Sequence, residues 1–214
     1  MKSNIYFISG IDTDTGKSYC TAYLANTMIQ NGHHVITQKF IQTGNVGRSE
    51  DIELHRRLMN IPPTPEDLKQ LTMPEIFSYP CSPHLAARID KRAINFSKIE
   101  HATQELAKRY DTVLIEGAGG LMVPLTEDFL TIDYIQEKKY PLVFVTSGKL
   151  GSINHTLLSL EAIQHRNIRL DYVLYNLYPV AKDTTIQEDT LQYIEKYLKK
   201  NFPETQFMIV PEMK

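Results

Sequence analysis

Short apolar runs alternate along this chain with longer segments in which apolar residues recur at helical spacing. The runs are rich in β-branched and aromatic residues, and they predict strands at 4–9, 34–39, 112–116, 142–147, 172–176 and 206–210. Several runs are almost continuously apolar, as central strands of a parallel sheet are when both faces are covered. The alternation therefore predicts an α/β fold of βαβ units, with a mostly parallel sheet and helices on both faces.

Three of the helical segments carry a clear apolar stripe. The stripes are Ile99, Ala102, Leu106 and Tyr110; Ile153, Leu157 and Leu160; and Leu191, Ile194 and Leu198. Ser97 and Glu100 match the S/T-x-x-E capping box and predict the start of the first of these helices. Thr185 and Glu188 predict the start of the last one in the same way, and Gly151 precedes the remaining helix.

Prolines interrupt both patterns between residues 60 and 83. They stand at positions 62, 63, 65, 74, 80 and 83. Proline fixes φ and lacks an N–H donor, so long regular structure is not expected there. The βαβ pattern resumes afterwards without a change of composition. The 214 residues are therefore predicted to form a single α/β domain, 1–214, with an irregular excursion at about 60–83.

Composition and charge remove several classes of function. With 42% apolar and 22% charged residues the chain has the composition of a globular enzyme. Its net charge of -2 gives no global field to attract nucleic acid or an anionic membrane, so neither is expected as a partner. There is no apolar stretch of ~20 residues, and the run 5–8 is too short for a signal peptide, so a cytoplasmic location is expected. Cys20, Cys81 and the scattered histidines lack metal-ligand spacing.

A glycine loop follows the first predicted strand directly. Residues 10–18 read GIDTDTGKS, and a helical segment continues to about Asn31, with Gly32 as its stop. In a P-loop the backbone N–H groups and a lysine hold the phosphates, and a serine hydroxyl ligates Mg²⁺; here Lys17 and Ser18 match. The strict pattern has four residues between the glycines and this loop has five. The strand before and the helix after it nevertheless favour a P-loop over an ordinary turn.

Glu116 is the candidate acid for a nucleotide-bound Mg²⁺. It ends the apolar run 113–115 and is followed by Gly117-Ala118-Gly119-Gly120. An acid at the end of a buried strand helps to hold Mg²⁺ in the Walker-B arrangement. A carboxylate buried without such a purpose would carry a large desolvation cost, so the position points to function.

Three classes of phosphate chemistry can be compared on the residues. A Ras-like GTPase would carry an Asn-Lys-x-Asp motif, but the corresponding strand ends Asn176-Leu177-Tyr178-Pro179. A partitioning-type ATPase would place a lysine directly after the first loop glycine, where this chain has Ile11. An ATP-dependent ligase that phosphorylates a carboxylate or carbamate needs a further cation on the transferring group. Lys39 ends the second predicted strand, at the edge of the sheet beside the P-loop, and can supply it.

Five motifs in order along nearly the whole chain resemble those of dethiobiotin synthetases. They are Gly10-x-Asp12-Thr13-x-x-Gly16-Lys17-Ser18, Lys39 with Thr43-Gly44, Ser82-Pro83-His84, Glu116-Gly117-Ala118-Gly119-Gly120 and Lys149-Leu150-Gly151-Ser152-Ile153-Asn154-His155. The resemblance implies an ATP- and Mg²⁺-dependent cyclo-ligase of biotin biosynthesis on a P-loop fold. CO₂ forms a carbamate on one amine of 7,8-diaminopelargonic acid, ATP phosphorylates the carbamate, and the second amine closes the ring to give dethiobiotin, ADP and phosphate.

The same resemblance implies roles for the matching residues. Lys17 and Lys39 are the implied catalytic residues. Ser18, Asp51 and Glu116 are the implied Mg²⁺ ligands, although a shift of one residue would nominate Glu50 in place of Asp51. The implied nucleotide-binding residues are Asp14, Thr15, Gly16, Lys17, Ser18, Tyr19, Asp51, Glu116, Gly117, Ala118, Gly119, Asn176, which reads the adenine edge, and Leu177. The implied substrate-binding residues are Thr13, Lys39, Thr43, Gly120, Leu150, Gly151, Ser152 and Asn154.

A homodimer is also implied, because in the family the loop matching 149–154 reaches into the neighbouring subunit's site. His84 and His155 are interpreted as packed rather than catalytic. Two alternatives stay open: a partitioning-type ATPase switch, and another amide-forming P-loop ligase of cofactor synthesis. A requirement for the diamine would separate the first from a ligase, and a requirement for a free carboxylate would indicate the second.

Nucleotide selectivity is expected to be relaxed. Family members continue beyond the strand ending near Pro211 and use that segment to complete the base pocket, whereas this sequence ends at Lys214. We expect kcat/KM with GTP or CTP to lie within roughly a thousand-fold of the value with ATP, because a base that meets few hydrogen-bonding groups is weakly discriminated. Steady-state kinetics with the three nucleotides measure this, and a larger preference for ATP would contradict it.

Overall fold

The computed structural model describes residues 4–178 and 183–212. Pro179 and Lys214, named above, lie outside the described residues. Among the described residues no helix is both long and apolar enough to cross a membrane.

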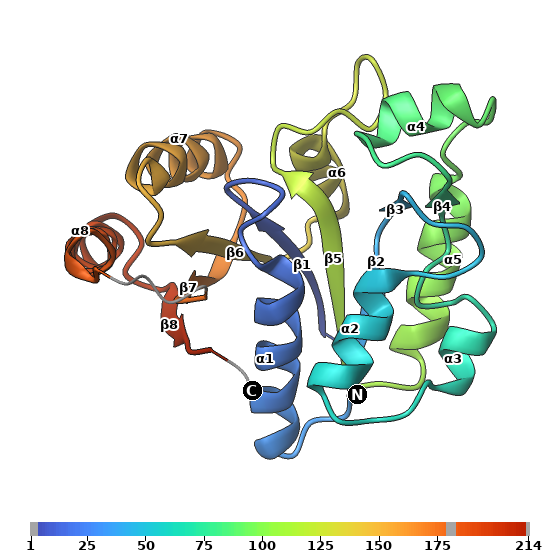
Figure 1. Ribbon diagram of the computed structural model, residues 1–214, viewed down its shortest axis with the longest axis horizontal. Helices are drawn as coiled ribbons and strands as arrows, with labels where there is room; N and C mark the ends of the chain where they lie inside the picture. The colour runs from blue at the N-terminus through green and yellow to red at the C-terminus, as the bar shows by residue number, and fades with distance from the viewer. Residues whose placement is uncertain (1–3, 179–182, 213–214) are drawn as a thin grey trace.

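A six-stranded parallel sheet forms the centre of the molecule (Figure 1). The strand order is β2-β5-β1-β6-β7-β8, and every neighbouring pair is parallel. The strands are β1 Asn4–Gly10, β2 Val35–Lys39, β5 Thr112–Gly120, β6 Leu142–Ser147, β7 Leu170–Asn176 and β8 Gln206–Val210. All six predicted strands are confirmed, but β5 runs on to Gly120, so Glu116 lies inside this strand and not at its end. A second sheet pairs β3 Gln42–Thr43 with β4 Ile76–Phe77, which the pattern did not predict.

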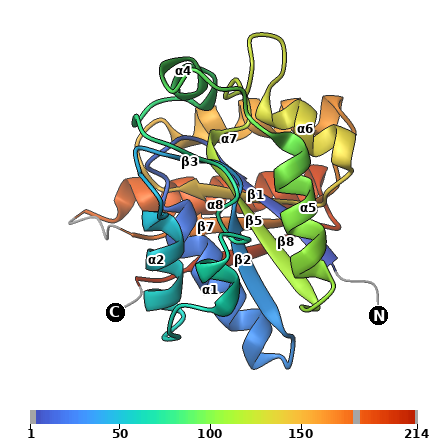
Figure 2. The ribbon, with the colours of Figure 1, turned by 90° about the vertical axis from the view of Figure 1, so that its right-hand side faces the viewer.

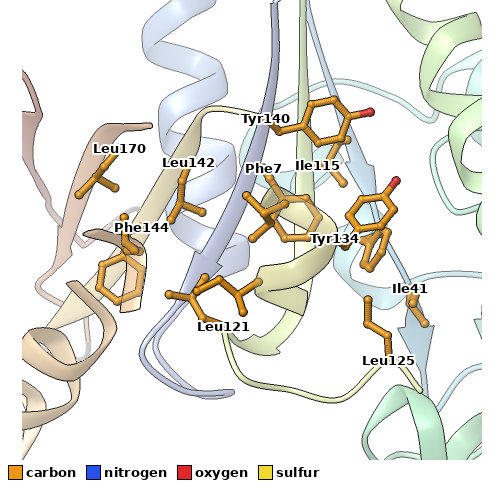
Figure 3. Packing of buried hydrophobic residues seen from close by; sticks show 14 of the residues in the cluster. Phe7, Ile41, Ile115, Leu121, Leu125, Tyr134, Tyr140, Leu142, Phe144 and Leu170 are labelled. Carbon is orange, nitrogen blue, oxygen red and sulfur yellow. The ribbon is translucent and has the colours of Figure 1, made fainter. Parts of the chain in front are cut away.

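Helices cover both faces of the sheet (Figure 2). They are α1 Lys17–Gln30 and α2 Glu50–Leu58 on one face, and α5 Phe96–Ala107, α6 Thr131–Lys138, α7 Ser152–His165 and α8 Thr185–Asn201 on the other. Successive residues of a strand point to opposite faces. Phe7 accordingly packs with Ile115 and Tyr134 under α5 and α6 (Figure 3), whereas Ile8 packs with Leu24 of α1. The α/β architecture with helices on both faces is confirmed.

The predicted end of the first helix is confirmed, since α1 ends at Gln30 and Gly32 has a φ of 86°. Both capping boxes are wrong. The cap of α5 is Asn95, whose side chain accepts a hydrogen bond from Lys98 N at 2.9 Å, so the helix begins before Ser97. The N-cap of α8 is Thr184, and its side chain makes no capping hydrogen bond. The backbone N–H of Thr185 donates instead to Asp183 Oδ1 at 2.9 Å.

The stripe predicted for α7 is also only partly correct. Leu160 is fully buried, but Ile153 and Leu157 are half-buried. The buried face of this helix runs through Thr156, whose hydroxyl bonds to that of Thr146 at 2.6 Å, and Ile163. The buried face of α7 thus includes a hydrogen bond between two hydroxyls, which a count of apolar residues cannot detect.

The proline-rich excursion contains short elements, as its prolines predict. α3 Pro65–Leu68 lies in it, and α4 Pro83–Ile89 starts at its end. Asp67 of α3 forms a bidentate salt bridge with Arg56 of α2, in which each carboxylate oxygen lies 2.8 Å from a guanidinium nitrogen. Both side chains are buried. This ion pair fastens the excursion to the helix that carries Asp51.

Replacing Asp67 with Asn should lower the free energy of unfolding by about 2 kcal/mol near pH 7, because Arg56 keeps an acceptor but loses the charge. Burial alone would raise the pKa of Asp67, but its bonds to Arg56 and Thr72 lower it below 3.8. The unfolded carboxylate therefore takes up its proton first, so the stabilisation is present above the unfolded pKa and is lost as the pH falls through the folded one. Urea titrations should show the difference between the two proteins shrinking below about pH 4. A difference that stays constant on acidification would contradict this.

Candidate functional site

The loop between β1 and α1 lies at the carboxyl edge of the sheet, between β5 and β6 (Figure 1). Gly16 caps α1 with a φ of 79°, and a Cβ built there would come within 2.2 Å of Asn176 Nδ2. Only glycine fits both the backbone conformation and the space. No side chain caps the first turn of α1, which leaves its N–H groups for an anion.

Lys17 folds back over this loop. Its Nζ donates to Asp12 O at 2.7 Å and to Thr13 O at 3.1 Å. Burial and the nearby Lys39 lower the pKa of Lys17 to about 8. Carbonyl oxygens are weak partners for an ammonium compared with phosphate oxygens. The lysine is thus held at the loop by contacts that an anionic ligand can replace.

Three oxygen-bearing side chains meet beside the loop. Ser18 Oγ lies 2.9 Å from Asp51 Oδ1 and 2.9 Å from Glu116 Oε1. Asp51 is placed by the start of α2, where the Ser49 hydroxyl accepts a hydrogen bond from Ile52 N at 3.2 Å. Carboxylate and hydroxyl oxygens are hard donors of the kind that Mg²⁺ takes.

Lys39 joins the two acids. Its Nζ lies 2.7 Å from Asp51 Oδ2 and 2.8 Å from Glu116 Oε1, and all but Asp51 are buried. Burial alone would lower the pKa of Lys39, but Glu116 and Asp51 raise it above the ordinary value. Burial alone would raise the pKa of Glu116, but Lys39 and His55 hold it well below its usual range. The site therefore contains a charged ammonium beside the ionised carboxylate of Glu116.

A cavity of about 720 Å³ opens over these groups. Its lining includes these predicted site residues: Thr13, Asp14, Gly16, Lys17, Ser18, Tyr19, Lys39, Thr43, Asp51, Glu116, Ala118 and Gly119. The proline-rich excursion contributes Pro80, Cys81, Ser82 and Pro83. The volume of the cavity is in the range of small-molecule sites. The cavity extends from the P-loop to the end of the excursion.

The cavity lining also separates the two acids at the start of α2. Asp51 faces the site, whereas Glu50 is 65% exposed and its nearest cation is Arg48 at 3.8 Å. Asp51 is therefore the residue placed beside Ser18, and Glu50 is not.

Asn176 lies behind the P-loop and does not line the cavity. Its Nδ2 donates to Thr15 O at 2.9 Å and to Tyr178 O at 3.0 Å, while its Oδ1 accepts from Tyr178 N at 3.1 Å. All the polar groups of this buried amide are thus engaged within the chain, and it braces the loop. An adenine edge could bond to it only by displacing one of these partners. Leu177 lines a separate hollow with residues of α8.

Several other predicted residues lie outside the cavity. Gly117 O accepts a bond from Lys39 Nζ at 3.2 Å, and Gly120 pairs with Gly10 in the sheet. The segment 150–154 lies at the start of α7, away from the lining within one chain. Its Leu150 is 80% exposed. Within one chain the segment 150–154 therefore does not line the cavity with the other predicted site residues.

Two contacts of Glu116 were not anticipated from the sequence. Its Oε2 accepts from Thr21 Oγ1 at 3.0 Å and lies 2.7 Å from His55 Nε2. His55 comes four residues after Asp51, so the two share a face of α2. The spacing of four residues between Asp51 and His55 was the feature of the sequence that could have identified His55. His84 bonds to Ser82 Oγ at 3.1 Å, but His155 is exposed, so the prediction that His155 is packed is wrong.

Known proteins resemble the whole chain. A family model described as an AAA domain matches residues 4–212. The ATP-dependent dethiobiotin synthetase BioD 2 of Pasteurella multocida is 48% identical over 97% of this chain and 97% of its own length. The Haemophilus ducreyi protein of the same name is 50% identical over 96% and 97%. The ATP-dependent dethiobiotin synthetase BioD of Chlorobaculum tepidum is 48% identical over 94% and 83%.

Solved structures with the same fold are more distant in sequence. Chloroplast FtsY from Physcomitrella patens has a TM-score of 0.55 at 15% identity, over 99% of this chain and 60% of its own. A ParA family ATPase from Chlorobium tepidum has a TM-score of 0.53 at 13% identity, over 99% and 84%. Identities this low support the fold alone.

Proposed function

This chain belongs to the AAA-domain family and, within it, to the ATP-dependent dethiobiotin synthetases, and from this premise we propose how its residues perform the reaction. The enzyme is a cyclo-ligase that uses ATP to convert 7,8-diaminopelargonic acid and CO₂ to dethiobiotin. The meeting of Lys17, Lys39 and Glu116 at one cavity carries the mechanism, because it supplies two ammonium groups where two anions must react.

Mg²⁺ is proposed to be held by Ser18, Asp51 and Glu116. Their three oxygens already converge, which fits a small hard cation. Among the described residues no group of three or more His, Cys, Asp or Glu could hold a metal. Mg²⁺ commonly takes water and phosphate oxygens as its other ligands. When bound, the ion neutralises charge on the β- and γ-phosphates.

Phosphoryl transfer is proposed to depend on the two lysines. The carbamate oxygen attacks the γ-phosphorus of ATP while the bond to the β-γ bridging oxygen breaks and ADP leaves. Lys17 would leave the carbonyls of Asp12 and Thr13 for the β- and γ-phosphates. Lys39 would face the carbamate and the transferring group from the other side. The oxygens of both reactants are anionic, so these cations lower the repulsion between them.

Ring closure needs orientation more than further charge. The second amine attacks the carbonyl carbon of the carbamic-phosphoric anhydride, phosphate leaves, and the proton of the amine passes to phosphate or water. The hydroxyls of Thr13 and Thr43 line the cavity and would hold the diamine or carbamate. The attack is already intramolecular, because both groups belong to one molecule, and positioning removes the remaining freedom of rotation between the amine and the carbonyl carbon.

A homodimer is proposed to complete the substrate site. Gly151 caps α7 with a φ of 95°, Ser152 opens that helix, Leu150 is 80% exposed, and Asn154 is exposed in the first turn. Free N–H groups at such a terminus suit the carboxylate tail of the diamine bound to the neighbouring subunit. The cytoplasmic location stays a prediction from the sequence.

The Mg²⁺ assignment makes a comparison of neighbours possible. Asp51→Asn should raise the Mg²⁺ concentration for half-maximal activity, roughly 10-fold or more, because one of two carboxylate ligands is lost. Glu50→Gln is the matched control and should leave it unchanged, since this side chain is exposed. Titration of activity with Mg²⁺ at saturating ATP measures both. A shift in the Glu50 variant in place of the Asp51 variant would contradict the assignment.

The reaction itself is tested by phosphate release from Mg·ATP and bicarbonate, with and without 7,8-diaminopelargonic acid. We expect release only with the diamine, in step with a cyclic urea detected by mass spectrometry. Diamine-independent hydrolysis would favour a partitioning-type switch, which the fold likeness to ParA alone does not support. Release that depends on a free carboxylate substrate would favour another amide-forming ligase.

A further inference from the structure

The carboxylate of Glu116 is held from both sides. Oε1 faces the cavity and bonds to Ser18 Oγ at 2.9 Å and Lys39 Nζ at 2.8 Å. Oε2 faces away and meets Thr21 Oγ1 at 3.0 Å and His55 Nε2 at 2.7 Å. The contact with His55 is the shortest of the four. His55 is wholly buried and lies one helical turn beyond Asp51, so α2 supplies both an acid of the site and a support for the other acid.

A chain of hydrogen bonds continues behind His55. Thr37 Oγ1 lies 3.1 Å from His55 Nδ1 and 2.8 Å from Arg56 Nη1. An arginine can only donate, so Thr37 accepts from Arg56 and has its own hydrogen for Nδ1. With Nδ1 as acceptor, the ring N–H is on Nε2 and points at Glu116. Asp67 holds Arg56 with two bonds of 2.8 Å, so the excursion fixes the far end of the chain.

We propose that His55 is a positioning residue: its Nε2–H holds Oε2 of Glu116 and thereby keeps Oε1 turned toward Ser18 and the cation. The other partner of Oε2, Thr21 Oγ1, has a single hydrogen and also lies 2.8 Å from Lys17 O. The terminal torsion of a glutamate is broad, so without His55 the carboxylate would rotate more freely. Hydrogen bonds to metal ligands from behind commonly matter 10- to 100-fold in metal affinity or activity, a rough range. The inference rests on the proposed Mg²⁺ site at Glu116.

His55 also fills a buried position, so the test must distinguish its hydrogen bond to Glu116 from its packing. His55→Leu places an apolar side chain of similar bulk at this position and removes the donor. His55→Gln places an amide N–H near the position of Nε2 and restores it. Ile99→Ala, on the buried face of α5, is the matched control, because it leaves a cavity in the core without touching this chain of bonds.

Mn²⁺ binding to the full chain, followed by electron paramagnetic resonance, is the first readout, since Mn²⁺ takes the same oxygen ligands as Mg²⁺. We expect the Leu variant to bind Mn²⁺ about 10- to 100-fold more weakly, and the Gln variant within about 3-fold of the unchanged protein. ATP binding in EDTA should be the same in all of them. The Mg²⁺ requirement of turnover should rise only in the Leu variant.

Three results would overturn the inference. The Leu variant could bind Mn²⁺ as the unchanged chain does. The Gln variant could lose affinity as far as the Leu variant, which would assign packing to His55. The Ile99→Ala protein could lose it equally, which would assign the effect to stability. Absence of Mn²⁺ binding by the unchanged chain would instead refute the metal site, and diamine-dependent phosphate release would still report separately on the ligase reaction.

Discussion

Lys39→Ala should lower kcat at least ~100-fold, the loss expected when one strong donor to a developing charge is removed. The reason is local: Nζ is buried and lies within 2.8 Å of both Asp51 and Glu116. From there it would face the carbamate and the transferring phosphoryl group. Without it, two carboxylates stand beside two anionic reactants with Lys17 as the remaining ammonium of the cavity. Single-turnover measurement of ADP formation with diamine and bicarbonate present reports on this step directly.

The variant also changes the acids, so its control must account for them. Removing the cation should let the pKa of Glu116 rise, because Lys39 is the main group that lowers it against burial. Thermal denaturation should confirm that the variant is folded before its turnover is interpreted. Lys199→Ala, an exposed change on α8, should leave kcat unaltered. Normal single-turnover rates in a folded Lys39→Ala protein would remove this lysine from the mechanism.

The sheet was predictable because its signal is local. Central parallel strands are buried on both faces, so each reads as an apolar run wherever it occurs in the chain. β3 and β4 were not predicted, because each has two residues, which are too few to show a hydrophobic periodicity. The helix starts failed for a different reason. Asparagine and serine are both favourable N-cap residues, so the sequence alone does not choose between Asn95 and Ser97. The hydrogen bond from Lys98 N to the Asn95 side chain makes Asn95 the cap.

The site was predictable as far as the motifs reach. Lys17 and Ser18 follow from the loop, and Lys39 and Glu116 from the ends of two apolar runs that prove to be neighbours, paired in register between β2 and β5. Geometry was needed to choose Asp51 over Glu50.

His55 lay beyond the motifs because its partner is distant in sequence. The histidine and Glu116 stand 61 positions apart and meet only when α2 packs beside β2. Asn176 shows the opposite limit. The resemblance implied a role at the adenine edge, but the engagement of Asn176 with Thr15 and Tyr178 depends on side-chain geometry.

Lys17→Ala should also lower kcat at least ~100-fold, and it should alter the dependence on pH. Burial and Lys39 lower the pKa of Lys17 to about 8 in the free enzyme. Above that pH its amine is increasingly neutral, so binding of ATP must take up a proton. Phosphate oxygens favour the charged form, which raises the pKa in the complex. In the unchanged protein kcat/KM for ATP should therefore fall as the pH rises through about 8.

The alanine variant lacks the titrating group, so its lower kcat/KM should not show that fall. Calorimetry in two buffers of different ionisation enthalpy gives the second measurement. ATP binding near pH 9 should take up about one proton in the unchanged protein and none in the variant. Both the pH dependence of kcat/KM and the proton uptake report on Lys17, since the pKa of Lys39 is raised and that lysine stays charged over this range. Matching pH profiles in the two proteins would mean that Lys17 is already charged in the free enzyme. The contacts to Asp12 and Thr13 would then hold an ammonium throughout, and ATP would simply exchange with them.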